Sequence, residues 1–129
     1  MPLVRISLRK GKPAAYRKKI AENIYLALRE TFDVPEEDRF VTVHEYEADN
    51  FFFSASYLGI ARSDDLVIIQ ITVSNTRSVA QKQALFKRIV ERLQKEPGLK
   101  PDDIFINLLE VAKENWSFGR GIAQYVTAA

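Results

Sequence analysis

The hydrophobic residues of the chain are grouped in two ways, and this grouping predicts strands and helices in a repeating order. Short apolar runs bounded by turn residues are typical of strands, whereas apolar residues spaced three or four positions apart are typical of helices. Strands are expected at about 2–8, 39–46, 66–74 and 104–111, and helices at about 13–31 and 78–95. The order strand, helix, strand therefore occurs twice, which predicts two β-α-β units.

A shift of 65 positions relates the two predicted units residue by residue. Each helix carries apolar residues at positions i, i+4 and i+8, which predicts equivalent buried faces. In the helices, the shift aligns Ile20, Ile24 and Leu28 with Leu85, Ile89 and Leu93, respectively. In the strands and the residues before them, it aligns Pro2, Asp38, Phe40, Val41 and Val43 with Val67, Asp103, Phe105, Ile106 and Leu108, respectively. We expect one α+β domain over residues 1–129 with an internal repeat of about 2–46 and 66–111, in which a four-stranded mixed sheet carries both helices on one face.

The other face of this sheet would lack a covering layer. The third strand is apolar at consecutive as well as alternate positions, as in a sheet that is buried on both faces. These positions are Val67, Ile68, Ile69, Ile71 and Val73. The connection 47–65 also carries several large aromatic residues, which monomers seldom leave uncovered. We therefore expect an oligomer that is assembled sheet to sheet and in which a neighbouring subunit covers this connection.

Composition excludes several kinds of site. The chain has no cysteine and one histidine, so we expect no disulfide, no thiolate chemistry, no metal site and no redox cofactor. A net charge of +2 is too small to indicate nucleic-acid binding. The basic residues near the first helix are interpreted as a solvated face, and they are Arg9, Lys10, Lys12, Arg17, Lys18 and Lys19. No apolar run is long enough for a membrane span and no secretory signal is recognisable, so the expected location is the cytoplasm.

Pro2 has the most distinctive chemical potential in the chain. A proline after the initiator methionine is small enough for Met1 to be removed, and the mature chain would then begin with a secondary amine at the end of a strand. Such an amine can act as base, acid or nucleophile. The alternative is a proline that only starts an edge strand, where its missing N–H has no consequence. If Met1 remains attached, the Pro2 nitrogen is an amide and no amine chemistry is possible.

Asp38 and Arg77 are the candidate partners of this amine. Asp38 precedes the second strand, where its carboxylate could accept a hydrogen bond from water or from a substrate. The alternative is a turn aspartate that satisfies nearby N–H groups, which is the role we expect of Asp103. Arg77 precedes Ser78, and Ser78 with Gln81 predicts a helix capping box. A guanidinium at this position suits a substrate carboxylate, and the alternative is a surface arginine beside a helix start.

The segment after the last strand contains two large aromatic residues among glycines. Trp116 and Phe118 are followed by Gly119, Arg120 and Gly121, a composition that suits a lid or the wall of a pocket. The single histidine, His44, lies within the second predicted strand and is interpreted as a packed or solvent-facing residue.

Taken together, these features resemble those of the tautomerase superfamily and, within it, of the malonate semialdehyde decarboxylases. The resemblance runs from Pro2 to about Thr127. Its motifs are Pro2, the doubled unit, Val34-Pro35 to Asp38-Arg39-Phe40, Arg77 and Trp116-Ser117-Phe118-Gly119-Arg120-Gly121. It implies a homotrimer with three active sites and catalysis by the amino-terminal proline without a cofactor.

The resemblance also implies roles for individual residues. Asp38 would position or activate water, and Arg77 would bind the substrate carboxylate. Asn75 stands where the decarboxylases carry another arginine, so one guanidinium would do the work of two. The substrate-binding set that we expect is completed by Trp116, Phe118 and Arg120.

Three hypotheses follow for the function. The first is a lyase that decarboxylates or hydrates small oxo acids through the Pro2 amine and has weak keto–enol tautomerase activity. The second is a dedicated tautomerase of a 2-oxo acid, favoured by Asn75 in place of an arginine. The third is a trimeric binding protein that has lost its chemistry, because a fold does not determine a function.

Overall fold

The computed structural model describes residues 1–126, and its elements follow the predicted order. The main elements are β1 (Pro2–Arg9), α1 (Ala14–Phe32), β2 (Val41–Tyr46), β3 (Val67–Ser74), α2 (Val79–Lys95) and β4 (Ile104–Val111). Short 3-10 helices occur at η1 (Ala48–Asn50), η2 (Tyr57–Gly59), η3 (Pro101–Asp103) and η4 (Lys113–Asn115). The last residues of the predicted domain, including Thr127, lie outside the described residues.

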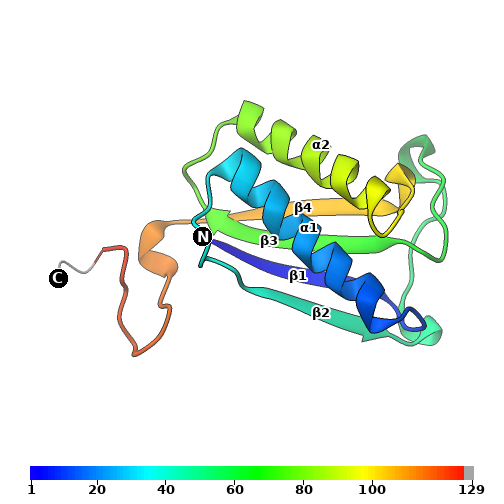
Figure 1. Cartoon of the computed structure of the whole chain (residues 1–129), viewed down its shortest axis with the longest axis horizontal. Helices are drawn as coiled ribbons and strands as arrows, with labels where there is room; N and C mark the ends of the chain where they lie inside the picture. The colour runs from blue at the N-terminus through cyan, green and yellow to red at the C-terminus, as the bar shows by residue number, and fades with distance from the viewer. Residues whose placement is uncertain (127–129) are drawn as a thin grey trace.

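The four strands form one mixed sheet in the order β2-β1-β3-β4. β1 is parallel to β2, β3 is parallel to β4, and the central pair β1/β3 is antiparallel. Both helices cover the same face of the sheet (Figure 1). The predicted α+β fold, with two helices on one face of a four-stranded mixed sheet, is therefore confirmed.

Strand register shows that the two halves are equivalent in three dimensions as well as in sequence. Val4 pairs with Val41 in the first half, and the residues 65 positions later, Ile69 and Ile106, pair in the second half. In the central pair, Arg5 faces Gln70, which is its own equivalent in the repeat. The halves are thus related by an approximate twofold axis between β1 and β3.

The core lies between the sheet and the helices. The predicted helical stripes are buried throughout, and they consist of Ile20, Ile24, Leu28, Leu85, Ile89 and Leu93. They pack on alternate residues of the central strands, among them Val4, Ile6, Ile69 and Ile71. Burial of one such side chain contributes about 1.5–3 kcal/mol.

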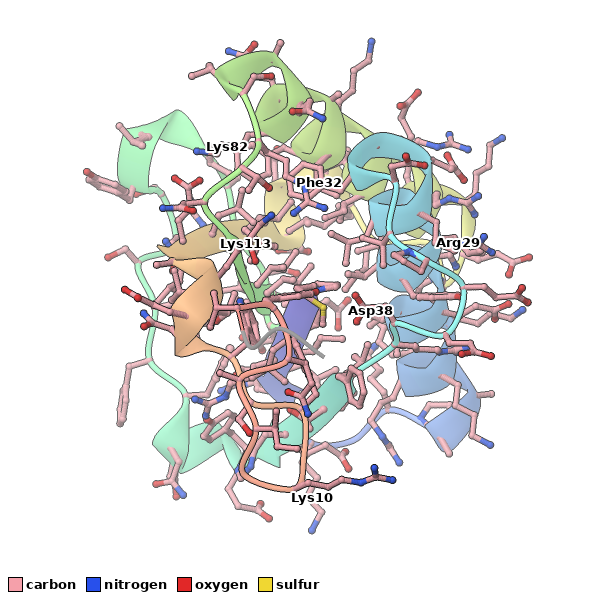
Figure 2. All side chains as sticks on the ribbon, turned by 90° about the vertical axis from the view of Figure 1, so that its left-hand side faces the viewer. Lys10, Arg29, Phe32, Asp38, Lys82 and Lys113 are labelled. Atoms are coloured by element: carbon pink, nitrogen blue, oxygen red, sulfur yellow. The ribbon has the colours of Figure 1, made fainter. Side chains whose placement is uncertain are left out.

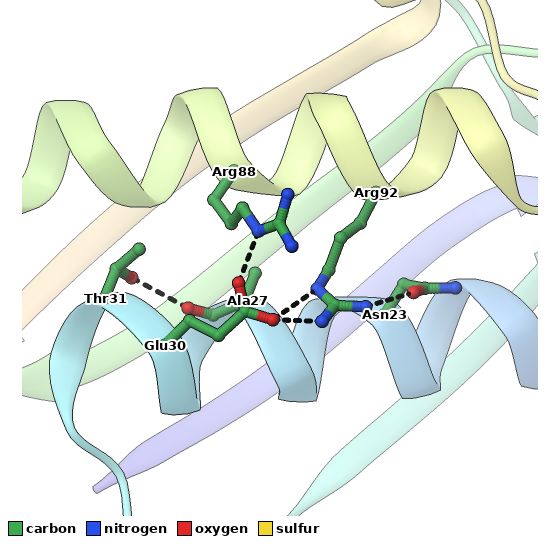
Figure 3. Close-up of polar contacts among 6 residues, drawn as sticks. All are labelled: Asn23, Ala27, Glu30, Thr31, Arg88 and Arg92. Atoms are coloured by element: carbon green, nitrogen blue, oxygen red, sulfur yellow. Dashed lines mark hydrogen bonds and ion pairs between the residues drawn. The ribbon is translucent and has the colours of Figure 1, made fainter.

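A polar cluster joins the two helices at the edge of this core (Figure 3). The Glu30 carboxylate of α1 accepts hydrogen bonds from Arg88 and Arg92 of α2. Arg92 also donates to Asn23 Oδ1 at 3.0 Å, and Asn23 Nδ2 donates to the Glu96 carbonyl at 3.2 Å. The cluster therefore ties the helix of the first half to that of the second.

The opposite face of the sheet is less apolar than expected. Four of the five apolar β3 residues, Val67, Ile69, Ile71 and Val73, point to the helices and are fully buried. Only Ile68 shares the open face, together with Gln70 and Thr72 of the same strand. Strand side chains alternate between the faces, so the apolar β3 residues lie mostly on the helix side, and burial of the open face by a neighbouring subunit stays a prediction.

Apolar side chains nevertheless remain uncovered in the protomer. Leu3, Phe105 and Leu109 on the sheet are exposed, as are Phe52, Tyr57 and Leu58 in the connection 47–65. In that connection Phe51 is buried and packs against Tyr46 and Phe53. Coverage of this surface by a neighbouring subunit stays a prediction. Within residues 1–126, no helix has the length and apolar character that crossing a membrane requires.

Candidate active site

Most of the predicted site residues lie at the end of the sheet where β1 begins. Pro2 pairs with Val73 near the end of β3, and the parallel pairing brings the turn before β2 to the same end. β4 also ends here, so the aromatic segment that follows it starts beside the N-terminus (Figure 1). Figure 2 looks at this end and labels Phe32, Asp38 and Lys113 around the start of β1.

The terminal amine of the chain is paired with Asp38. The Met1 ammonium nitrogen lies 2.9 Å from Asp38 Oδ2, and the two side chains are 9% and 11% exposed. Asp38 Oδ1 is buried and has no hydrogen-bond partner among residues 1–126. The Asp38 N–H donates to the Pro35 carbonyl at 3.0 Å, which fixes the turn. The carboxylate thus holds an amine and retains one acceptor oxygen for a further donor.

An apolar cavity of about 470 Å³ lies on one side of this ion pair, and we call it the aromatic cavity. It is lined by Met1, Pro2, Leu3, Phe40, Thr72, Val111, Asn115, Trp116, Ser117 and Phe118. Trp116 Nε1 donates to Ser74 Oγ at 3.2 Å, and its ring stacks on Phe118 at 5.5 Å between centroids. The segment after β4 therefore forms a pocket wall, as its composition suggested.

A second and more polar cavity of about 250 Å³ lies on the other side, and we call it the polar cavity. It is lined by Met1, Pro35, Asp38, Ser74, Thr76, Arg77, Lys113 and Tyr125. Met1 is the residue that lines both cavities. The amino terminus thus separates a space suited to an apolar group from a space suited to a charged group.

Arg77 lines the polar cavity, and two of its five N–H donors are engaged by the protein. Nη2 donates to the Phe32 carbonyl at 2.9 Å, and Nη1 donates to Thr76 Oγ1 at 3.3 Å. The guanidinium also lies over the Phe32 ring, 4.9 Å from its centroid. Phe32 is the last residue of α1, so the negative end of that helix stabilises the arginine beside the positive end of α2. The predicted capping box at Ser78 and Gln81 is confirmed.

Two predicted substrate-binding residues are not brought into either cavity. The Asn75 N–H extends the β3/β4 pairing by donating to the Val111 carbonyl at 3.0 Å, and the Asn75 side chain is exposed. Arg120 is also exposed and has a φ of 61°. Within one protomer the structure therefore assembles Pro2, Asp38, Arg77, Trp116 and Phe118 but not these two. Their roles in substrate binding stay predictions.

Tyr125 and Lys113 line the polar cavity but were not expected there. The Tyr125 ring packs edge-on against Phe118 at 5.0 Å between centroids. Burial raises the pKa of Tyr125, the Asp38 carboxylate raises it further, and Arg77 has an opposing effect. At neutral pH the phenol is therefore a neutral hydrogen-bond donor. No motif marks either residue, and only the path of the segment after β4 brings them to Asp38.

Metal ligands are not clustered in this region. Across residues 1–126, no group of three or more histidine, aspartate or glutamate side chains could hold a metal ion. His44 is exposed in β2 and its ring lies 4.3 Å from that of Tyr46, which agrees with its interpretation as a solvent-facing residue. The expectation of no metal and no cofactor stays a prediction.

Family models agree with this arrangement. Two models, each described as "Tautomerase enzyme", match residues 38–119 and residues 2–61. The chain belongs to the tautomerase family. Among curated proteins it is similar to "Probable tautomerase YusQ" of Bacillus subtilis (strain 168), with 37% identity over 126 residues that cover 98% of this chain and 99% of that protein. "Probable tautomerase YrdN" of the same organism is 34% identical, with 98% of each chain covered.

Solved structures of tautomerase-family proteins have the same fold. Malonate semialdehyde decarboxylase, solved in wild-type, mutant and inactivated forms, matches with a TM-score of 0.89 and 31% identity over 95% of both chains. FG41 malonate semialdehyde decarboxylase inhibited by 3-bromopropiolate matches with a TM-score of 0.90 and 35% identity, covering 96% of this chain and 94% of that one. A fused 4-OT wild-type symmetric trimer has a TM-score of 0.78 at 18% identity over 95% of this chain and 97% of that one, which shows the fold alone. The predicted membership of the tautomerase superfamily is confirmed, and the protein is a tautomerase-family enzyme.

Proposed function

We propose that this tautomerase-family protein is an amino-terminal proline enzyme that decarboxylates or hydrates small oxo acids and also catalyses their keto–enol tautomerisation. One observation carries the proposal. The amine of the chain is held by Asp38 between an apolar cavity and a cationic one, and an amphiphilic oxo acid needs these two surroundings.

The proposal requires removal of Met1. In the full-length chain the Pro2 nitrogen is part of an amide and has no basic lone pair. Because Met1 lines both cavities, its removal would open the space between them and make Pro2 the terminal amine beside Asp38. The position of Pro2 supports this role, since its pairing with Val73 of β3 restrains its backbone.

In the decarboxylation that we propose, the substrate carboxylate lies in the polar cavity and its 3-oxo group faces the Pro2 amine. The cationic amine polarises the carbonyl, or its neutral fraction condenses with the carbonyl to an iminium. The bond between the carboxyl carbon and C2 breaks, and its electron pair moves towards the carbonyl or iminium as carbon dioxide leaves. A proton then adds at C2, and in the iminium route water, which was released on condensation, adds back to free the carbonyl product and the Pro2 amine. For hydration, the unpaired Asp38 Oδ1 would orient the attacking water.

The second candidate is a dedicated tautomerase of a 2-oxo acid with a bulky apolar group. The stacked Trp116 and Phe118 rings and the cavity volume of about 470 Å³ favour a substrate larger than a three-carbon acid. In this reaction a neutral Pro2 amine would remove a proton from C3 of the keto form and return a proton to oxygen. The names of the curated relatives point to the same activity.

We also propose that the active form is a homotrimer. The exposed Leu3, Phe105 and Leu109 side chains on the open face of the sheet would be covered in such an assembly. The symmetric trimer formed by the fused 4-OT protein of the same fold supports this assembly.

Intact-mass spectrometry combined with two assays tests the enzymatic proposal. Wild-type protein and Pro2→Ala are compared for decarboxylation of malonate semialdehyde and for tautomerisation of phenylpyruvate. We expect a mass without Met1 and a loss of at least 100-fold in kcat/KM in Pro2→Ala, whose primary amine is less nucleophilic and is not held by a ring. The substrate with the higher kcat/KM indicates whether the protein is mainly a lyase or mainly a tautomerase. Absence of both activities in protein that lacks Met1 would favour a non-catalytic binding trimer.

A further inference from the structure

The polar cavity contains more positive charge than its single carboxylate can balance. Met1, Arg77 and Lys113 line it together with Asp38, and Asp38 is already paired with the Met1 amine at 2.9 Å. Arg77 directs two of its donors to Phe32 and Thr76 of the protein itself. The cavity is therefore suited to an anion, to which Arg77 can offer its remaining N–H donors and Lys113 its ammonium group.

Lys113 is held at this position by η4. The Asn115 N–H donates to the Ala112 carbonyl at 3.0 Å, and the Trp116 N–H donates to the Lys113 carbonyl at 3.4 Å. These bonds fix the turn whose later residues, Asn115 and Trp116, line the aromatic cavity while Lys113 lines the polar one. Figure 2 shows Lys113 and Asp38 at the same end of the sheet.

Within residues 1–126 the Lys113 ammonium has no ion pair or hydrogen bond. The nearest acidic residue of β4, Glu110, is engaged by Lys82 of α2 at 2.7 Å. Glu114 follows Lys113 in η4, and both residues are exposed, but only Lys113 lines the cavity. All three ammonium donors of Lys113 are thus available to a ligand.

The repeat provides an independent argument. The residue equivalent to Lys113 in the first half is Ala48, so the lysine has no counterpart at the other end of the sheet. The equivalent of Arg77 is Lys12, which pairs with Asp65 at 3.0 Å. The repeat equivalents of the two basic residues in the polar cavity are thus an alanine and a lysine that is paired with a carboxylate, so this pair of cations, unpaired within residues 1–126, is not a feature that the repeat requires.

From these observations, and resting on the function proposed above, we infer that Lys113 binds the substrate carboxylate. Arg77 joins the end of α1 to the start of α2, shapes the cavity wall and keeps N–H donors that can share the same carboxylate. The apolar part of the substrate extends past the amine into the aromatic cavity, where it contacts Trp116 and Phe118. The substrate class is a 2- or 3-oxo acid with one carboxylate at the Lys113 end.

A binding experiment tests this assignment without depending on catalysis. Trp116 is the only tryptophan of the chain, and its fluorescence reports on the aromatic cavity. Protein lacking Met1 is titrated with phenylacetate and with neutral phenylacetamide, using wild type, Lys113→Gln, Lys113→Arg and, as a matched control, Lys87→Gln on the exposed surface of α2. Melting curves of all variants verify that they are folded.

We expect Lys113→Gln to weaken phenylacetate binding about tenfold and to leave phenylacetamide binding unchanged, because one charge-assisted hydrogen bond is lost. Lys113→Arg should restore most of the affinity, and Lys87→Gln should bind as wild type does. Equal affinity of wild type and Lys113→Gln for phenylacetate, or no binding by wild type, would overturn the inference.

Kinetics separate this inference from the proposed function. If phenylpyruvate is turned over, Lys113→Gln should raise its KM about tenfold and have a smaller effect on its methyl ester. If no oxo acid is turned over but phenylacetate binding depends on Lys113, the proposed reaction is wrong and the carboxylate site stands.

Discussion

The two halves of the molecule share a core but differ at the ends where their parallel strands begin. Asp38 and Asp103 occupy equivalent positions before β2 and β4. Asp103 is 1% exposed and accepts hydrogen bonds from the Ser63 N–H at 2.7 Å and the Ser63 hydroxyl at 2.6 Å. Asp38 instead holds the terminal amine and keeps one oxygen unpaired. The protein supplies donors to both oxygens of Asp103, whereas it leaves one oxygen of Asp38 open to a further donor, as the proposed function requires.

The aromatic wall is duplicated as well. Phe51 and Phe53 follow η1 with centroids 5.9 Å apart, and Trp116 and Phe118 follow η4 at the repeat spacing. The repeat equivalent of Met1 is Leu66. The second half therefore has a buried leucine at the position where the first half has the amino terminus of the chain. Duplication thus preserved the packing, while a free amine exists at one end only because a chain begins once.

Among the substitutions that test this difference between the halves, replacement of Asp38 should have the largest effect, and the effect should be on activity. Asp38→Asn in protein without Met1 is expected to lower kcat/KM by about 10²–10⁴, because a neutral amide can neither pair with an ammonium nor accept a proton. Steady-state assays with phenylpyruvate measure the loss. The melting temperature should change by only a few degrees, since Asp38 Oδ1 has no partner among residues 1–126. Unchanged kcat/KM would remove Asp38 from the mechanism.

Replacing Asp103 should instead lower the stability of the protein and leave its activity unchanged. Asp103→Asn keeps the shape but weakens two hydrogen bonds from Ser63 at a buried site, so the free energy of unfolding should fall by about 2 kcal/mol. Urea denaturation measures this change, and activity at a temperature where the variant is folded should match wild type. A double-mutant cycle with Ser63→Ala isolates the pair. A stable but inactive Asp103→Asn would show that the second half also takes part in chemistry.

The smallest expected effect concerns the contact between the halves at Glu30. Hydrogen bonds from Arg88 and then Arg92 lower the pKa of Glu30 in the folded protein, and partial burial opposes this. Its contribution is therefore present above the unfolded pKa of about 4.3 and is lost as the pH falls through the lower folded value. Because the group is solvent-accessible, Glu30→Gln should destabilise the protein by only about 0.5–1 kcal/mol at pH 7.

Denaturation at several pH values measures the Glu30 effect. The difference between wild type and Glu30→Gln should shrink below about pH 4.5 and with added salt. Glu37→Gln, in an exposed turn, removes the same formal charge and serves as the control. A difference that stays constant down to acidic pH would mean that packing of the side chain, not its charge, connects the helices.

Periodicity in the sequence was enough to predict the elements, the repeat and the buried helical stripes. Burial of the second face of β3 stays a prediction, because one protomer shows only that Ile68 shares this face with Gln70 and Thr72. Pro2, Asp38 and Trp116 could be nominated from position and residue type. Lys113 and Tyr125 could not be nominated in this way, because their local sequence does not indicate the path that the segment after β4 takes past the sheet.

The sequence by itself determined that two equivalent β-α-β units pack around one apolar layer, because helix and strand periodicities are local and the hydrophobic effect acts on every buried position alike. Only the tertiary structure decided that Asp38 and not Asp103 meets the amine, that Arg77 is drawn to the carbonyl end of α1, and that Lys113 faces the cavity. These outcomes depend on strand order, register and the path of irregular segments, which bring charges together across long separations in the chain. Interactions between exposed charges are largely screened beyond about 10 Å, so this geometry decides which carboxylate can pair with the amine.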